Sequence, residues 1–178
     1  MNPPDIRWGT ITERREVKNH PFQTFSCTDP HPKTPQGRKL PHPKQWEWDA
    51  QGFIRQSSHY FRPGNLLVVG WSLTDSEILA VAHLMPDAAA GRFSVHVGVI
   101  GVSTTVRGQG GSVADRTLKE AHIAALGDAR ASEAGALFAT ANIHTRNFAS
   151  QRLFERCGYE PHGVPSGDLQ QWFCRLDA

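Results

Sequence analysis

The sequence predicts a domain of the mixed α/β class, with a mostly antiparallel sheet and helices packed against it. Apolar segments separated by short turns, at residues 65–72, 77–85 and 93–102, are typical of antiparallel strands. A helix-like segment at 113–126 and a strand-like segment at 136–144 follow, and this order is typical of a crossover between parallel strands. The length of 178 residues suits one core, so we expect a single domain over residues 1–178.

The N-terminal third predicts fewer regular elements. Residues 7–17 alternate irregularly and indicate a first strand. The segment at about 18–45 contains six prolines, which exclude one long helix or a central strand and predict a long, atypical loop with a short strand at 22–27. Residues 46–61 predict a helix. Its apolar face would hold Trp46, Ala50, Phe53, Ile54, Ser57 and Tyr60.

The second half of the chain predicts two helices and a final strand. A helix over 113–126 is indicated by one stripe of small and apolar residues, Ala114, Leu118, Ala121 and Ala125. Gly127 is expected to end it, because glycine commonly follows the last helical turn. Residues 147–157 predict a second helix ended by Gly158, and residues 170–176 predict the last strand.

Composition narrows the class of protein. No apolar run approaches the 18 residues of a membrane span and no signal-peptide core is visible, so we expect a cytoplasmic protein without membrane contact. Residues 1–62 hold ten Lys/Arg and six Asp/Glu (+4), and the rest hold nine and eleven (−2). Without an aromatic–basic stripe, nucleic acid is not the favoured partner. No metal is expected, because no metal-ligand spacing joins the three cysteines, which we expect to be small buried hydrophobic residues: Cys27, Cys157 and Cys174.

The most informative stretch is the glycine-rich segment Val102–Ser112, between a predicted strand and a predicted helix. Glycines let the backbone approach an anion, and the first N–H groups of the helix point at it. A Walker loop is disfavoured because no lysine lies between Val102 and Leu118. The interpretation as a dinucleotide-binding loop is also weakened. Val113 stands where that loop needs its third glycine, and residues 136–145 contain no acidic residue. Taken alone, the segment also fits a turn without a ligand.

Two motifs together resemble a known family. Arg107-Gly-Gln-Gly-Gly-Ser112 resembles the Arg-x-x-Gly-x-Gly/Ala pyrophosphate loop of GNAT-type N-acetyltransferases, and Val102-x-x-x-Val106 matches the approach to that loop. Asn147 to Tyr159 resembles the second signature of the family, Asn-x-x-Ala-x-x-Leu-Tyr-x-x-x-Gly-Phe, with its spacing kept. The resemblance covers roughly residues 65–160.

The resemblance implies a sheet that splays between its fourth and fifth strands, here 93–102 and 136–144, with acetyl-CoA in the wedge. The amides of 107–112 would hold the pyrophosphate at the helix N-terminus, and 102–104 would pair with the pantetheine. The Val102 N–H would also face the oxyanion. The cofactor-binding residues so implied are Val102, Ser103, Thr104, Arg107, Gly108, Gln109, Gly110, Gly111, Ser112, Asn147 and Phe154.

Direct attack by an amine on the thioester also needs a base to take the proton of the amine. His96, on the strand before the glycine loop, is the first candidate. By alternation it would share a strand face with Ser94, Gly98 and Ile100. His83 is the second candidate, although its position resembles a core position; for both, a hydrogen-bonded structural histidine is the alternative. Glu47 and Asp49 are weaker candidates, since acids at a helix start usually complement the helix dipole.

Three positions depart from the family pattern. Phe154 stands where the family often has a tyrosine that protonates the departing thiolate, so water, Ser150, Cys157 or no acid at all must serve. Ser112 replaces the last glycine or alanine of the loop and should preserve binding, since serine favours helix starts. Asp115 stands where an apolar residue normally packs the helix on the sheet. Either the helix is rotated or Asp115 meets a basic partner.

We therefore expect acetyl transfer from acetyl-CoA to a primary amine of a small molecule or protein, with homodimer formation left open. One alternative is a weakly catalytic acyl-CoA-binding module, which Phe154 favours. Another is a tRNA-acetylating GNAT toxin, which Phe25-Ser-Cys27 and Trp46-Glu-Trp-Asp49 faintly resemble. The acceptor is not identified, because residues 18–62 lie outside the resemblance. Aromatic residues there that could line an acceptor pocket are Trp46, Trp48, Phe53, Tyr60 and Phe61.

Overall fold

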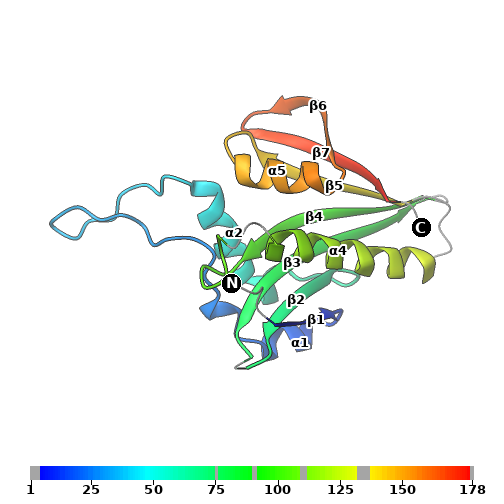
Figure 1. Cartoon of the computed structure of the whole chain (residues 1–178), viewed down its shortest axis with the longest axis horizontal. Helices are drawn as coiled ribbons and strands as arrows, with labels where there is room; N and C mark the ends of the chain where they lie inside the picture. The colour runs from blue at the N-terminus through cyan, green and yellow to red at the C-terminus, as the bar shows by residue number, and fades with distance from the viewer. Residues whose placement is uncertain (1–4, 75, 90–91, 109–111, 132–136, 177–178) are drawn as a thin grey trace.

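A computed structural model of the chain describes residues 5–74, 76–89, 92–108, 112–131 and 137–176. It contains one seven-stranded sheet in the order β1-β2-β3-β4-β5-β7-β6 (Figure 1). The strands are β1 (Ile6–Ile11), β2 (Leu66–Ser72), β3 (Ile78–Ala89), β4 (Arg92–Val102), β5 (Leu137–His144), β6 (Glu160–Ser166) and β7 (Leu169–Leu176). The helices are α1 (Arg14–Asn19), the 3-10 turn η1 (Phe22–Thr24), α2 (Gln45–Arg55), α3 (Ser57–Tyr60), α4 (Ser112–Ala131) and α5 (Phe148–Arg156).

All neighbouring strands pair antiparallel except β4 and β5, which are parallel and joined through α4. This arrangement confirms the predicted mixed, mostly antiparallel class. The β4–β5 pairing runs from Phe93 opposite Leu137 to Val97 opposite Ala141 and then stops. Beyond those residues the two strands separate, and Figure 1 shows them close together near the C-terminus and apart at their other ends.

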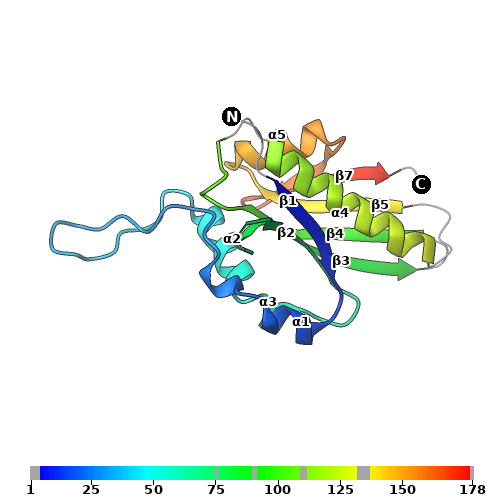
Figure 2. The same ribbon diagram turned by 60° about the horizontal axis from the view of Figure 1, so that its bottom comes forward.

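Helices cover both faces of the sheet (Figure 2). On one face, α4 and α5 enclose the larger core, where Leu118, Ala121 and Ala125 of the predicted stripe are buried. Helix α4 does not end at Gly127 as predicted but continues to Ala131. Ala129 is buried in the same core. Packing of this last turn therefore outweighs the helix penalty of one glycine, about 1 kcal/mol.

On the other face, α2 packs on β4 and closes a second core. The N-terminal predictions need three corrections here. Strand β1 ends at Ile11, and Val17 is a buried residue of α1. Residues 22–27 contain the 3-10 turn and no strand, because their apolar side chains pack beneath α2 instead of pairing in the sheet. The helix predicted over 46–61 is divided at Gln56 into α2 and α3.

Strand β6 was missed because it contains Pro161 and Pro165 and is exposed along its whole length. Proline is tolerated there because β6 is an edge strand, which needs only one set of ladder hydrogen bonds. The proline-rich segment 29–44 projects away from the sheet as an arm (Figures 1 and 2). A bridge between Lys33 and Lys39 closes its outer part. No helix in the described part of the chain is long and apolar enough to cross a membrane.

Strand β4 carries a bulge at Gly98. His83 of β3 pairs with Val99 and Leu84 pairs with Val97, so Gly98 is the extra residue. Val97 packs in the core beneath α4, whereas Val99 packs in the core beneath α2, although a regular strand would place both on one face. The expectation that His96 and Ile100 share a face was therefore wrong: the bulge turns Ile100 to the α4 side.

Candidate functional site

Two cavities lie where β4 and β5 separate. The loop-side cavity, of about 390 Å³, is enclosed by the end of β4, the glycine loop and the starts of α4 and α5. The α2-side cavity, of about 620 Å³, is enclosed by α2, β4 and β5. The two cavities meet in the gap between β4 and β5, because both are lined by Trp46, Ala50, Ile100, Asn147 and Ser150.

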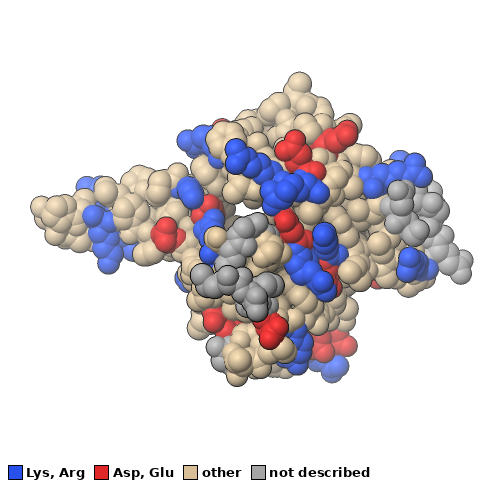
Figure 3. Space-filling view, viewed as in Figure 1, with Lys and Arg blue, Asp and Glu red and all other residues tan. Residues whose placement is uncertain are grey.

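The loop-side cavity carries the described part of the glycine loop. Arg107, Gly108 and Ser112 line it, and α4 begins at Ser112, so the N-terminal amides of a long helix border the cavity. Gly108 has φ +83°, a conformation that other residues rarely adopt. Gln109, Gly110 and Gly111 were predicted to bind the cofactor and lie outside the described residues. Figure 3 shows this face hollowed, with basic side chains beside the hollow.

The end of β4 presents one amide to the gap. Ser103 donates its N–H to Leu79 O at 2.8 Å, and Thr104 donates its N–H to Ser26 O at 2.8 Å. Because successive N–H groups of a strand point to opposite sides, the Val102 N–H points away from β3 and toward the gap. Of the three residues predicted to pair with pantetheine, Val102 has this orientation, while the amides of the other two are used within the chain.

The Arg107 side chain turns away from the loop and binds Glu47 of α2. Its Nη1 and Nη2 lie 3.0 and 2.8 Å from the two carboxylate oxygens, and Nη1 also donates to Cys27 O at 2.8 Å. Thr28 donates to the same carboxylate. Burial alone would raise the pKa of Glu47, but the Arg107 hydrogen bond and charge outweigh it and lower the pKa. Glu47 thus fastens the glycine loop to α2, a role that the sequence did not reveal.

At the start of α5, Asn147 caps the helix and holds Ser150. Asn147 Oδ1 accepts from Ser150 N at 3.2 Å, and Asn147 Nδ2 donates to Ser150 Oγ at 2.8 Å. Phe154 is buried edge-on against Tyr159 and lines the α2-side cavity. The Tyr159 hydroxyl is bonded to His122 Nε2 at 2.9 Å. It therefore faces α4 and does not replace the hydroxyl that is missing at Phe154.

The two predicted bases lie beside the α2-side cavity without being among its lining residues. His96 Nδ1 is 2.9 Å from Thr140 Oγ1, near the last paired residues of β4 and β5. Burial lowers the pKa of His96, so the ring is neutral at pH 7. His83 is 2% exposed, and Asn65 Nδ2 lies 2.9 Å from its Nε2. Burial, together with the charge of nearby His96, lowers the pKa of His83 to about 4.

The α2-side cavity is lined by two polar residues that the sequence did not single out, His144 and Asp168, and by Asp49, one of the weaker candidate bases. His144, the last residue of β5, stacks on Trp46 with ring centres 4.6 Å apart, and its Nδ1 accepts from Arg146 N–H at 3.1 Å. Asp168 Oδ2 lies 3.9 Å from His144 Nε2. Asp49 and Asp168 both line this cavity. The position of His144 at the end of a wedge strand was the one signal that could have found it.

The aromatic residues predicted for an acceptor pocket separate into two groups. Trp46 and Phe53 line the α2-side cavity. Trp48 instead packs against His31 at the base of the arm, with ring centres 4.2 Å apart. Tyr60 is exposed and Phe61 is buried in the core beneath α2. Trp46 and Phe53 therefore belong to the cavity wall, where α2 faces the gap, and Tyr60 does not lie on the buried face that helical spacing predicted.

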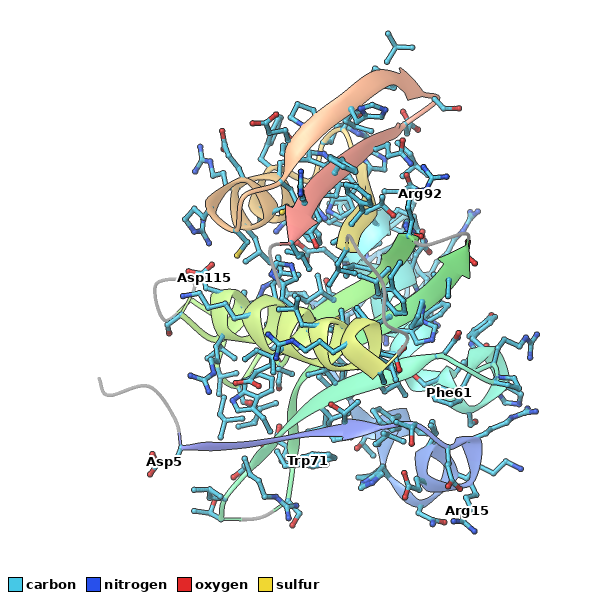
Figure 4. All side chains as sticks on the ribbon, turned by 90° about the vertical axis from the view of Figure 1, so that its right-hand side faces the viewer. Asp5, Arg15, Phe61, Trp71, Arg92 and Asp115 are labelled. Atoms are coloured by element: carbon cyan, nitrogen blue, oxygen red, sulfur yellow. The ribbon has the colours of Figure 1, made fainter. Side chains whose placement is uncertain are left out.

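Asp115, the acidic residue at the start of α4 where the family has an apolar one, has a basic partner. This confirms the second of the two alternatives expected for it. Arg156 Nη2 donates to Asp115 Oδ1 at 2.6 Å and so links α5 to α4. Figure 4 shows Asp115 near the beginning of α4, on the side toward α5. Cys27 and Cys174 are buried and Cys157 is half-buried, all as thiols. Within the described residues, no group of His, Cys, Asp and Glu is arranged to hold a metal ion.

Comparison with known proteins identifies the fold. No known family profile and no curated protein matches the sequence. Among solved structures, AtaTR bound with AcCoA covers 96% of this chain and 93% of its own at a TM-score of 0.60 and 14% identity. The structure of a putative acetyltransferase of the GNAT family from Desulfovibrio desulfuricans matches 97% of this chain and 99% of its own chain. Its TM-score is 0.57 and its sequence identity is 16%. The chain has the GNAT fold.

AtaT complexed with acetyl-methionyl-tRNAfMet has the same fold, with a TM-score of 0.56, 12% identity and coverage of 94% of each chain. In this chain, the GNAT fold accounts for the position of both cavities. The parallel β4–β5 pair opens toward the glycine loop, so the first turn of α4 and the first turn of α5 face the same gap. The two motifs found in the sequence thus lie on the two sides of one cavity.

Proposed function

We propose that the chain is an N-acetyltransferase that transfers the acetyl group of acetyl-CoA directly to a primary amine in a ternary complex. The observation that carries this proposal is the meeting of two cavities in the gap between β4 and β5. One cavity has a helix N-terminus and basic residues for an anionic cofactor, and the other has carboxylates for a cationic acceptor. The likeness to AtaTR, which was solved with AcCoA, supports this cofactor.

Acetyl-CoA would enter the loop-side cavity. The backbone amides of 107–112 would bind its pyrophosphate at the start of α4. Val102 would offer its N–H to the thioester carbonyl, which becomes the oxyanion during attack. Asn147 would contact the cofactor from α5. Ser103 and Thr104 would shape the backbone there without lending their N–H groups, since these are bonded to Leu79 and Ser26.

The amine would approach through the α2-side cavity. Asp49 and Asp168 attract its ammonium form, and His96 accepts a proton through a water molecule, because its ring is neutral and lies outside direct reach of the cavity. The neutral amine nitrogen then attacks the thioester carbon. The C–N bond forms and the C–S bond breaks. The sulfur leaves as a thiolate and takes up one proton, and the new amide nitrogen gives up its excess proton, so one proton moves from nitrogen to sulfur overall.

We propose that Ser150 protonates the departing thiolate. Phe154 has no proton to donate, and Cys157 is not among the residues that line the two cavities. Ser150 lies where the cavities meet, and its Oγ accepts from Asn147 Nδ2. Its own hydroxyl proton therefore stays available for the departing sulfur. This assignment selects one of the alternatives that the sequence left open.

Ligand-induced stabilisation tests the cofactor first. At 100 times its Kd, acetyl-CoA should stabilise the native state by about 2.7 kcal/mol, and a missing shift in Tm would reject the proposal. A panel of primary amines, followed by the release of free CoA thiol, then tests turnover. Stabilisation without thiol release from any amine would favour the acyl-CoA-binding module over the enzyme.

One observation favours a macromolecular acceptor as a second candidate. The projecting arm carries the basic residues Lys33, Arg38, Lys39 and Lys44, and one structure with the same fold is AtaT complexed with acetyl-methionyl-tRNAfMet. Aminoacyl-tRNA would then be the amine. Acetylation of charged tRNA in vitro, with arrest of translation on expression, would support this candidate. Efficient turnover of small amines without either effect would reject it.

A further inference from the structure

Two buried hydrogen-bond donors border the α2-side cavity without a partner in the described part of the chain. They are His83 Nδ1 and Trp46 Nε1. Asn65 Nδ2 donates to His83 Nε2, so the ring carries its proton on Nδ1. A buried donor without a partner costs about 1–3 kcal/mol, and native structures retain few such groups. A substrate atom that accepts a hydrogen bond from His83 Nδ1 would remove the cost of that donor.

His83 lies behind the cavity wall at the bulge of β4. Gly98 lines the cavity, and His83 Nδ1 lies 3.5 Å from the point where a Cβ on residue 98 would stand. Phe53, which also lines the cavity, has its ring centre 5.2 Å from that of His83. The absent side chain at residue 98 therefore brings the buried donor to the cavity wall. A bulge beside a cavity is a common device for such a change in direction.

Met85 covers this position. Its terminal methyl lies 2.6 Å from the same Cβ point, beside His83 Nδ1. Methionine is unbranched and flexible, so its methyl can swing away at small cost when a ligand atom arrives. Trp46 contributes its indole from the opposite wall, where α2 begins. His83 Nδ1 is thus a buried donor just behind an apolar part of the cavity wall, between the Met85 methyl and the Phe53 ring.

We propose that the acceptor substrate carries, next to its amine, an uncharged oxygen that accepts a hydrogen bond from His83 Nδ1. The chemical class is an amino amide or amino alcohol rather than a plain alkyl amine. An amino acid with a free carboxylate is disfavoured, because Asp49 and Asp168 line the same cavity. The inference rests on the proposed function and changes the role of His83 from base to donor.

The test compares alaninamide with 3-methylbutan-2-amine, which has the same shape and lacks the oxygen. Binding of each amine to the CoA-loaded protein is measured by calorimetry, so that the result does not depend on turnover. We expect alaninamide to bind about tenfold more tightly to the wild-type protein, and His83→Phe to abolish this preference. The exposed His59→Phe on α3 is the matched control and should keep it.

Met85→Ala provides an independent variant if His83→Phe fails to fold. Removing the covering methyl should keep or increase the preference for alaninamide. Equal affinities of the wild-type protein for the two amines would overturn the inference. So would a preference for alaninamide in His83→Phe that is as large as in the wild-type protein. Failure of the proposed function is visible separately, because acetyl-CoA would then produce no shift in Tm, or a shift without release of CoA thiol from any amine.

Discussion

Replacing Glu47 with glutamine tests the ion pair that fastens the glycine loop to α2. The carboxylate receives Arg107 Nη1 and Nη2 at 3.0 and 2.8 Å and Thr28 Oγ1 at 3.1 Å, and its side chain is 11% exposed. Glutamine keeps one acceptor oxygen and turns an NH₂ group toward the guanidinium. Loss of charge-assisted bonds costs about 1.5–3 kcal/mol, which we reduce to about 1–2 kcal/mol because Arg107 is 41% exposed.

For a chain of this length, that loss corresponds to a fall in Tm of about 2–8 °C, measured by calorimetry at pH 7. The pKa of Glu47 is lowered from 4.5 by folding, so its contribution is present above pH 4.5 and is lost as the pH falls through the folded pKa. Wild type and variant should therefore converge in acid. Asp49→Asn, at an exposed residue of the same helix that takes no part in the Arg107 ion pair, should change stability by less than about 0.5 kcal/mol. Equal Tm values for wild type and Glu47→Gln at pH 7, or a difference that persists unchanged in acid, would refute the role of Glu47.

Four further substitutions examine the fold and the chemistry. Gly101→Ala places a Cβ 2.5 Å from Ile54 Cδ1 and should lower the free energy of unfolding in urea by about 1–3 kcal/mol. Gly127→Ala has open space around it and should raise that free energy by about 0.5–1 kcal/mol. His96→Ala should remove the acidic limb of the pH–rate profile. We expect this limb below pH 6.5, because burial lowers the pKa of His96. An unchanged profile would exclude His96 as the base. Ser150→Ala should lower kcat about 100-fold with little change in the KM for acetyl-CoA. An unchanged kcat would exclude Ser150 as the group that protonates the thiolate.

Much of the fold was readable from local pattern. The strands β2 to β5, the helix after the glycine loop and the capped helix α5 were all predicted, since each has its own periodicity or boundary residue. Gly158, for example, ends α5 with φ +86°, as glycine at this position suggested. Local pattern failed where packing overruled it. Helix α4 passes through Gly127 because its last turn is buried, and β6 accepts proline because it lies at an edge.

The site was less readable because its residues meet only through the tertiary fold. Arg107 and Glu47 belong to segments far apart in the chain, and the pairing of their charges follows from the packing of α2 on β4. Likewise, His144 and Trp46 come together because β5 ends beside the start of α2. No periodicity within one segment carries this information, so the sequence indicated Arg107 as a cofactor contact and did not indicate His144.

The sequence by itself predicted a glycine-rich turn before a helix and a second helix capped by Asn147, at the spacing of one family, because both features depend on local backbone preferences of glycine, serine and asparagine. Only the tertiary structure decided what surrounds them. The bulge at Gly98 reversed the faces of β4, separated His96 from Ile100 and brought His83 to the cavity wall. One extra residue in a strand leaves no mark on composition. It becomes visible only when the partner strand shows which residue has no pair.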